Sequence, residues 1–286
     1  MGPAAASTPR TSHITREQIV ALGNRLPPSL GIFGRLQAVL RDANNDLDDI
    51  VQLINVDPAL TFQVIKLSNS AIFGIQSRCE SIEQAVARVG FGNIQQLVGL
   101  AVARQAFQGA LANYEIYPLN LWENAVATSS LMAAFAERAG SDAPAAHSIG
   151  LLRTIGTVIL NNWQGAVRYP GESAFPDVHS WERATYGMTA AEVSAVLLDH
   201  WRFSAETVDA VRGHLVPAKA GSGNELAARL HLSCALTDSW GYALNGEHGV
   251  WHLNDQVCIL ANLTEDDVKA ATDTARTRFD QAAQVG

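Results

Sequence analysis

The stretch "DPALTFQVIKLSNS", residues 57–70, has the composition of a short helix with marked ends. Asp57 is expected to be the N-cap, and Pro58 suits the first helical position, where a missing N–H leaves no hydrogen bond unmade. Asn69 and Ser70 end the stretch, and we expect their side chains to hydrogen-bond the helix end or the following turn. A ligand contact by these four residues is the alternative interpretation.

The segments around this stretch have the same helical pattern. Residues 44–55, "NNDLDDIVQLIN", place apolar side chains on one helical face after Asn45 or Asp46 as the cap. Residues 81–90, "SIEQAVARVG", begin with a capping box, and Gly90 is expected to end that helix before another begins at Asn93. Helical segments recur to the end of the chain, whereas alternating β-branched residues are almost absent. The sequence therefore predicts an all-α bundle.

One break in the pattern predicts how the chain is organised. Residues 109–120, "GALANYEIYPLN", interrupt the helices with glycine and proline. We therefore predict one domain over residues 14–286, with an N-terminal helical lobe at 14–115 and a C-terminal lobe at 116–286. Residues 1–13 are expected to form a disordered tail.

Composition limits the class of protein. The 286 residues are 48% apolar and 17% charged, which is typical of a globular protein. The net charge is −8 and the sequence contains no basic run, so we expect no nucleic-acid binding, which requires clustered lysine and arginine.

Cysteine usage and hydropathy predict a cytoplasmic protein. Cys79, Cys234 and Cys258 are odd in number and far apart, which fits buried, reduced thiols better than disulfides. We find no apolar run near the roughly 18 residues of a membrane span, and no signal-peptide pattern at the start. We therefore expect no membrane association.

The chain resembles the HDOD domain, the HD-related output domain of bacterial signalling proteins. The resemblance extends from about Leu26 to the end. It rests on "LPPSL" (26–30), "INVDPALTFQVIKLSNSAIFG" (54–74), "SIEQAVARVGFGNIQQLV" (81–98), "GLLRTIG" (150–156) and "ERATYGMTAAEVSAVLLDHW" (182–201). Gly90, Gly156 and Trp201 belong to these motifs and are expected to be mainly structural. The resemblance implies a two-lobed relative of the HD phosphohydrolases that acts through protein contacts.

The residues at the positions of the HD metal site do not suit a metal. HD enzymes bind their metal through an adjacent His-Asp pair, and this chain has Arg153 and Thr154 there, inside the apolar segment 147–160 that we expect to be helical. A guanidinium has no free lone pair, and a threonine hydroxyl is a poor ligand. Asn124 stands where relatives often have histidine, and Asp238 is the nearest candidate for the last ligand. The resemblance therefore implies a degenerate site with no metal and no cofactor.

Another metal group would need His200 and His214 to approach Glu182 or Asp199. We favour the interpretation that these histidines lie at the surface or near helix caps. The tryptophans of the C-terminal lobe are expected in the core or between the lobes. They are Trp122, Trp163, Trp181, Trp201, Trp240 and Trp251.

Arg153 has two interpretations. Within the former metal cleft it is expected to form an internal ion pair with Glu123 or Glu182. Alternatively, it contacts the carboxylate or phosphate of a small ligand.

The expected function is a non-catalytic signal-transduction module that acts through protein–protein interaction. The resemblance implies a histidine kinase, a response regulator or a cyclic-dinucleotide enzyme as the partner, acting in trans because no receiver, GGDEF or EAL segment is present. Two alternatives are a divergent metal-dependent phosphohydrolase acting on a nucleotide, and a pseudoenzyme that senses a small anionic ligand beside Arg153.

Overall fold

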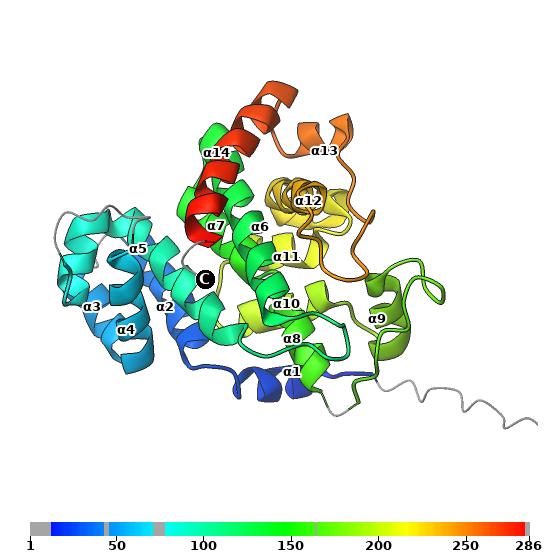
Figure 1. The fold of residues 1–286 in the computed structure, drawn as a ribbon, viewed down its shortest axis with the longest axis horizontal. Coiled ribbons are helices and arrows are strands. Elements are labelled where there is room, and N and C mark those ends of the chain that lie inside the picture. The colour runs from blue at the N-terminus through cyan, green and yellow to red at the C-terminus, as the bar shows by residue number, and fades with distance from the viewer. Residues whose placement is uncertain (1–12, 43–45, 71–77, 164, 284–286) are drawn as a thin grey trace, which may run out of the picture.

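The computed structural model describes residues 13–42, 46–70, 78–163 and 165–283, and in these ranges every regular element is a helix (Figure 1). The all-α prediction is therefore confirmed. Residues 1–12 of the predicted tail, the possible cap Asn45 and the motif residues 71–74 lie outside the described residues.

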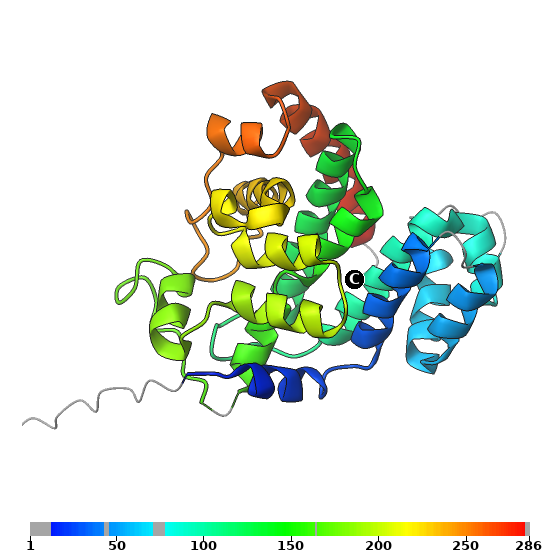
Figure 2. The ribbon, with the colours of Figure 1, turned by 180° about the vertical axis from the view of Figure 1, so that it is seen from behind.

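The N-terminal helices other than α1 pack around α5. The bounds are α1 (Arg16–Gly23), α2 (Ser29–Arg41), α3 (Leu47–Asn55), α4 (Pro58–Ser68) and α5 (Ile82–Ala106). Helices α2, α3 and α4 contact α5 and form one side of the molecule (Figures 1 and 2). Gly90 has non-helical backbone angles, φ 79° and ψ 166°, and α5 consists of two helical segments that meet at a kink there. The sequence prediction that one helix ends at Gly90 before another begins is therefore confirmed.

The C-terminal group packs around α6. The bounds are α6 (Pro118–Arg138), α7 (Ala143–Leu152), α8 (Ile155–Asn162), α9 (Val178–Tyr186), α10 (Ala190–His200), α11 (Ala205–Gly213), α12 (Asn224–Ser239), α13 (Asp255–Leu260) and α14 (Glu265–Ala283), with short 3-10 turns at Pro217–Lys219 and Gly221–Gly223. Helix α6 contacts α7, α12 and α14, while α10 contacts α8 and α11 (Figure 2).

The apolar segment 147–160 is not one helix. Helix α7 ends at Leu152 and α8 begins at Ile155, so Arg153 and Thr154 form the turn between them. The Ser194 hydroxyl donates to the carbonyl oxygen of Arg153 at 2.7 Å and accepts from the N–H of Gly156 at 2.8 Å. This hydroxyl therefore binds both sides of the break.

Gly156 is required by the close approach of α8 to α10. A Cβ atom at this position would lie 2.0 Å from the carbonyl oxygen of Ala190, a contact that no side chain permits. The break at Arg153 and Thr154, together with the missing side chain at Gly156, allows the turn between α7 and α8 to lie against α10.

The two lobes share one buried core. An apolar cluster runs from Ile14 to Ala282 through both groups of helices. Helix α1 lies in the predicted N-terminal lobe but packs against α8 and α10, and the N–H of Ile14 donates to the carbonyl oxygen of Tyr186 at 3.1 Å. By contact, this first helix therefore groups with the C-terminal helices.

One segment is long and apolar enough to cross a membrane by length and composition, although the sequence suggested no such segment. Ala143–Asn162 has a mean hydropathy of 1.2 over its best window, because Arg153 is its only charged residue. In the fold 89% of that window is buried against other helices.

Candidate functional site

A buried ion pair lies at the turn between α7 and α8. Nη1 of Arg153 donates to Oε1 of Glu247 at 3.0 Å, and Nη2 donates to Oε2 at 2.9 Å. The two side chains are only 3% and 6% exposed. Glu247 comes from the loop between α12 and α13, 94 residues after Arg153. Two parallel bonds match the planar guanidinium to the carboxylate and fix both side chains.

Asn124 of α6 completes this pair. Its Oδ1 accepts from Nη2 of Arg153 at 2.7 Å, while its Nδ2 donates to the carbonyl oxygen of Tyr242 at 2.8 Å. Burial alone would raise the pKa of Glu247, but the adjacent Arg153 outweighs this effect and lowers that pKa below its ordinary value. The pair is therefore held in its ionised form.

A second acidic group lies beside the pair. Glu182 of α9 accepts from the hydroxyl of Tyr114 at 3.0 Å and from the N–H of Ala190 at 2.7 Å. The His179 ring lies between the two carboxylates, with Nδ1 3.5 Å from Glu182 and Nε2 3.8 Å from Glu247. Neither ring nitrogen has hydrogen-bond geometry. Burial disfavours the charged ring, but the two carboxylates outweigh it and raise the pKa of His179.

The Trp251 indole joins the ionised groups to a cluster of histidines. The guanidinium of Arg153 lies 5.6 Å from its ring centre, within reach of a cation–π attraction. His214 stacks on the indole at 5.4 Å and 15°, while His179 and His231 approach it edge-on. Burial, followed by the charge of Arg153, lowers the pKa of His214 to about 3. That ring is therefore neutral at physiological pH.

The site does not suit the metal that the HD fold implies. Across the described part of the chain, no group of three or more His, Cys, Asp or Glu side chains could hold a metal ion. The cavity beside His179, Glu182 and Glu247 measures about 10 Å³, close to the roughly 10–15 Å³ that one water needs. A permanent cation, the Arg153 guanidinium, already neutralises Glu247.

The other predicted site residues are dispersed. Thr154 is 2% exposed and its hydroxyl has no partner. Oδ1 of Asp238 lies 3.1 Å from Nδ1 of His248, separate from the Arg153 site. Asp199 and His200 are exposed, and Asp199 pairs with Arg16, whereas His214 is buried against Trp251. Arg153 pairs with Glu247, and not with either of the two suggested partners, Glu123 and Glu182.

The family-motif residues near α4 bond to backbone. Asp57 accepts from the N–H groups of Ala59 and Leu60 at the start of α4. The Asn69 amide binds both the N–H and the carbonyl oxygen of Cys79, at 2.7 and 2.8 Å. These contacts are internal to the N-terminal helices.

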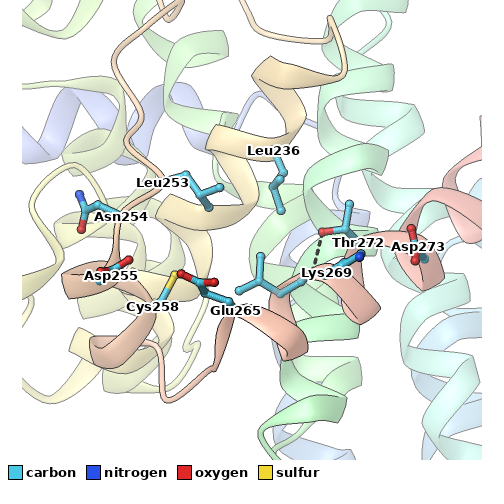
Figure 3. A pocket seen from close by; sticks show the side chains of 10 residues that line it. Leu236, Leu253, Asn254, Asp255, Cys258, Glu265, Lys269, Thr272 and Asp273 are labelled. Atoms are coloured by element: carbon cyan, nitrogen blue, oxygen red, sulfur yellow. Dashed lines mark hydrogen bonds between the residues drawn. The ribbon is translucent and has the colours of Figure 1, made fainter.

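A separate hollow of about 420 Å³ opens between α12, α13 and α14 (Figure 3). Leu236, Leu253 and Val268 form its apolar surface. Three carboxylates and the ammonium of Lys269 border it, and the carboxylates belong to Asp255, Glu265 and Asp273. It shares no lining residue with the Arg153 site.

The family model of the HDOD domain matches residues 26–217, about two thirds of the chain. The chain belongs to the HDOD family. An uncharacterized protein of Treponema pallidum is 29% identical over 191 residues, which are 63% of this chain and 35% of that protein. The HDOD chain thus spans about a third of that relative's length.

Solved structures share the HDOD fold. An HDOD domain protein from Geobacter sulfurreducens has a TM-score of 0.72 at 18% identity, covering 94% of this chain and 98% of its own. A candidate phosphohydrolase from Shewanella amazonensis has a TM-score of 0.70 at 20% identity, covering 93% and 97%. A candidate signal transduction protein from Marinobacter aquaeolei has a TM-score of 0.69 at 22% identity, covering 94% and 64%.

Sequence reasoning missed several members of the site, and Glu247 and His179 are the two that carry or share its charge. Glu247 lies beyond residue 217, where the HDOD match ends, in a loop with no motif. His179 precedes the "ERATYG" segment and also lacks a motif. The one available signal was chemical, since a buried arginine requires a carboxylate.

Proposed function

We propose that this HDOD protein is a signalling module that hydrolyses no phosphoester and acts by binding another protein. The observation that carries the proposal is the buried pair of Arg153 and Glu247. The guanidinium stands where HD hydrolases present their His-Asp pair, and a fixed positive charge repels a divalent cation. Asn124 and Glu247 both serve this guanidinium, so neither is available to a metal.

Exposed apolar side chains support the binding of another protein. Tyr117 and Leu119 are 70% and 61% exposed at the start of α6. They adjoin a hollow of about 230 Å³ that Leu119, Pro118 and Trp122 help to line. The indole Nε1 of Trp122 is buried without a hydrogen-bond partner. Apolar groups gathered at a surface are typical of interaction sites. We propose a cytoplasmic partner that is a histidine kinase, a response regulator or a cyclic-dinucleotide enzyme.

The catalytic half of the proposal is tested by metal content and turnover. The purified protein is assayed with saturating Mn²⁺ against a panel of phosphomonoesters, nucleotides and cyclic dinucleotides. We expect no stoichiometric transition metal and no turnover above the buffer rate. Bound metal together with turnover would replace the proposal with a phosphohydrolase.

The binding half is tested by pairwise measurements against the three partner classes from the same genome. We expect one of them to bind, and the double substitution Tyr117→Ser with Leu119→Ser to abolish that binding. Ile259→Ser is the matched control, because Ile259 is 77% exposed on α13. Failure of all three classes to bind would contradict the proposal. If the double variant binds normally, the interaction surface lies elsewhere and the role of α6 is refuted.

A further inference from the structure

A polar cavity of about 250 Å³ lies where α5, α6, α7 and α14 meet. In the fold, α14 packs along α6 and its last turns approach α5, between the two groups of helices (Figures 1 and 2). The cavity shares no lining residue with the Arg153 site. Its apolar wall includes Leu100 and Val126. Its polar groups are Asn93, Gln96, Ser130, His147, Arg278 and Gln281.

His147 of α7 is a buried polar group at this cavity whose ring has an unpaired nitrogen. The residue is 7% exposed, and its Nδ1 has no hydrogen-bond partner. Most buried polar groups in native proteins are paired, so an unpaired ring atom in a residue that lines a cavity requires an explanation, and a bound ligand is one that the cavity offers. Burial, with a smaller effect of the Arg278 charge, lowers the pKa of His147 to about 3. The ring is therefore neutral and presents one donor and one acceptor.

Arg278 supplies the positive charge at the cavity. Its Nη2 donates to Oε2 of Glu137 at 2.9 Å, and both of these side chains are partly exposed. A guanidinium has five N–H donors, so this bond leaves others for the cavity. The side chains of Gln96, Ser130 and Gln281 have no hydrogen bond to another described residue, and all three can donate.

We propose that this cavity binds a small metabolite with one carboxylate group. The carboxylate faces Arg278 and the adjacent amides, the apolar part lies against Leu100 and Val126, and a polar substituent reaches His147. Glu137 already pairs with this guanidinium, so a carboxylate, which brings one negative charge, is less strongly opposed than a dianionic phosphate, which brings two. The volume is below the roughly 300 Å³ at which drug-sized sites begin, so the ligand is small.

The test measures binding of pyruvate, lactate, isobutyrate and inorganic phosphate to the full chain at constant ionic strength. Calorimetry gives the dissociation constant, and thermal unfolding gives the stabilisation that accompanies binding. We expect at least one carboxylate to bind more tightly than phosphate. Arg278→Gln should raise its dissociation constant roughly tenfold or more, as expected for the loss of one hydrogen bond to a charged group. His147→Gln removes a hydrogen bond between neutral groups, so it should raise the dissociation constant of pyruvate or lactate by about two- to tenfold.

Two controls separate ligand contact from structural damage. Lys269→Gln removes a positive charge from the same helix, outside the cavity, and should leave binding unchanged. Glu137→Gln breaks the same ion pair as Arg278→Gln but frees the guanidinium, so it should keep or strengthen binding. The proposal is overturned if no carboxylate binds at millimolar concentration, if phosphate binds more tightly, or if Glu137→Gln and Arg278→Gln weaken binding equally. Arg278 is 39% exposed, so its variant should fold even if the His147 variant does not.

Discussion

Replacing Arg153 by methionine should destabilise the fold strongly, because it leaves Glu247 buried without a counter-charge. Removing one partner of a buried pair costs about 3–5 kcal/mol, and the loss applies here because both side chains are at most 6% exposed. At roughly 2–4 °C per kcal/mol, the melting temperature should fall by about 6–20 °C. Urea unfolding followed by tryptophan fluorescence measures the free energy directly.

The double variant Arg153→Met with Glu247→Met is the matched control. Two apolar side chains of similar size need no counter-charge, so the double variant should recover most of the loss, to within about 1–2 kcal/mol of the wild type. A single variant that loses less than about 1 kcal/mol, or a double variant no more stable than the single one, would refute the reasoning.

The pH dependence of the single variant gives an independent check. In the wild type the folded pKa of Glu247 is lowered, so its contribution is present above the unfolded pKa of about 4.5 and is lost as the pH falls through the folded pKa. Without the guanidinium of Arg153, burial should raise that pKa instead. Acidification from pH 7 to 5 should therefore reduce the difference in unfolding free energy between the Arg153→Met variant and the wild type. A constant difference would show that Glu247 is not the cause.

Three further changes test the surroundings of the site. Gly90→Ala should lower the free energy of unfolding by about 1–3 kcal/mol in a urea titration. The positive φ alone causes this loss, because an added Cβ meets nothing within 4 Å. Gly92→Ala, two residues later, should be neutral or stabilising in the same titration. Gly150→Ala should cost about 1–3 kcal/mol in the same assay, since its Cβ would lie 2.5 Å from the Cα of Ser129. The pKa of His179 is raised in the folded state, so the contribution of this ring to the free energy of unfolding is complete below about pH 6.5 and is lost as the pH rises through the folded pKa. His179→Gln should therefore flatten the decline in unfolding free energy between pH 6 and 8. An unchanged slope would exclude His179 as the source of that decline.

Local signals in the sequence predicted the helices well, because caps act within a few residues. Asp46 and Asp57 both accept from the N–H groups that their cap positions require. The break between α7 and α8 was not predictable in this way, since an apolar segment has the pattern of one helix until Ser194, from α10, bonds both sides of the turn. Glu247 was missed for the same reason, because its partner lies 94 residues away and only tertiary packing joins them.

The Arg153 pair also constrains how this chain could change over evolutionary time. A substitution of Arg153 by histidine would remove the cation that Glu247 and Asn124 both contact. Each later step toward a metal ligand set would then begin from a destabilised protein. Three positions on separate elements, α6, the α7–α8 turn and the α12–α13 loop, would have to change nearly together. A single substitution at this site therefore cannot convert it into a metal site, because these residues depend on one another.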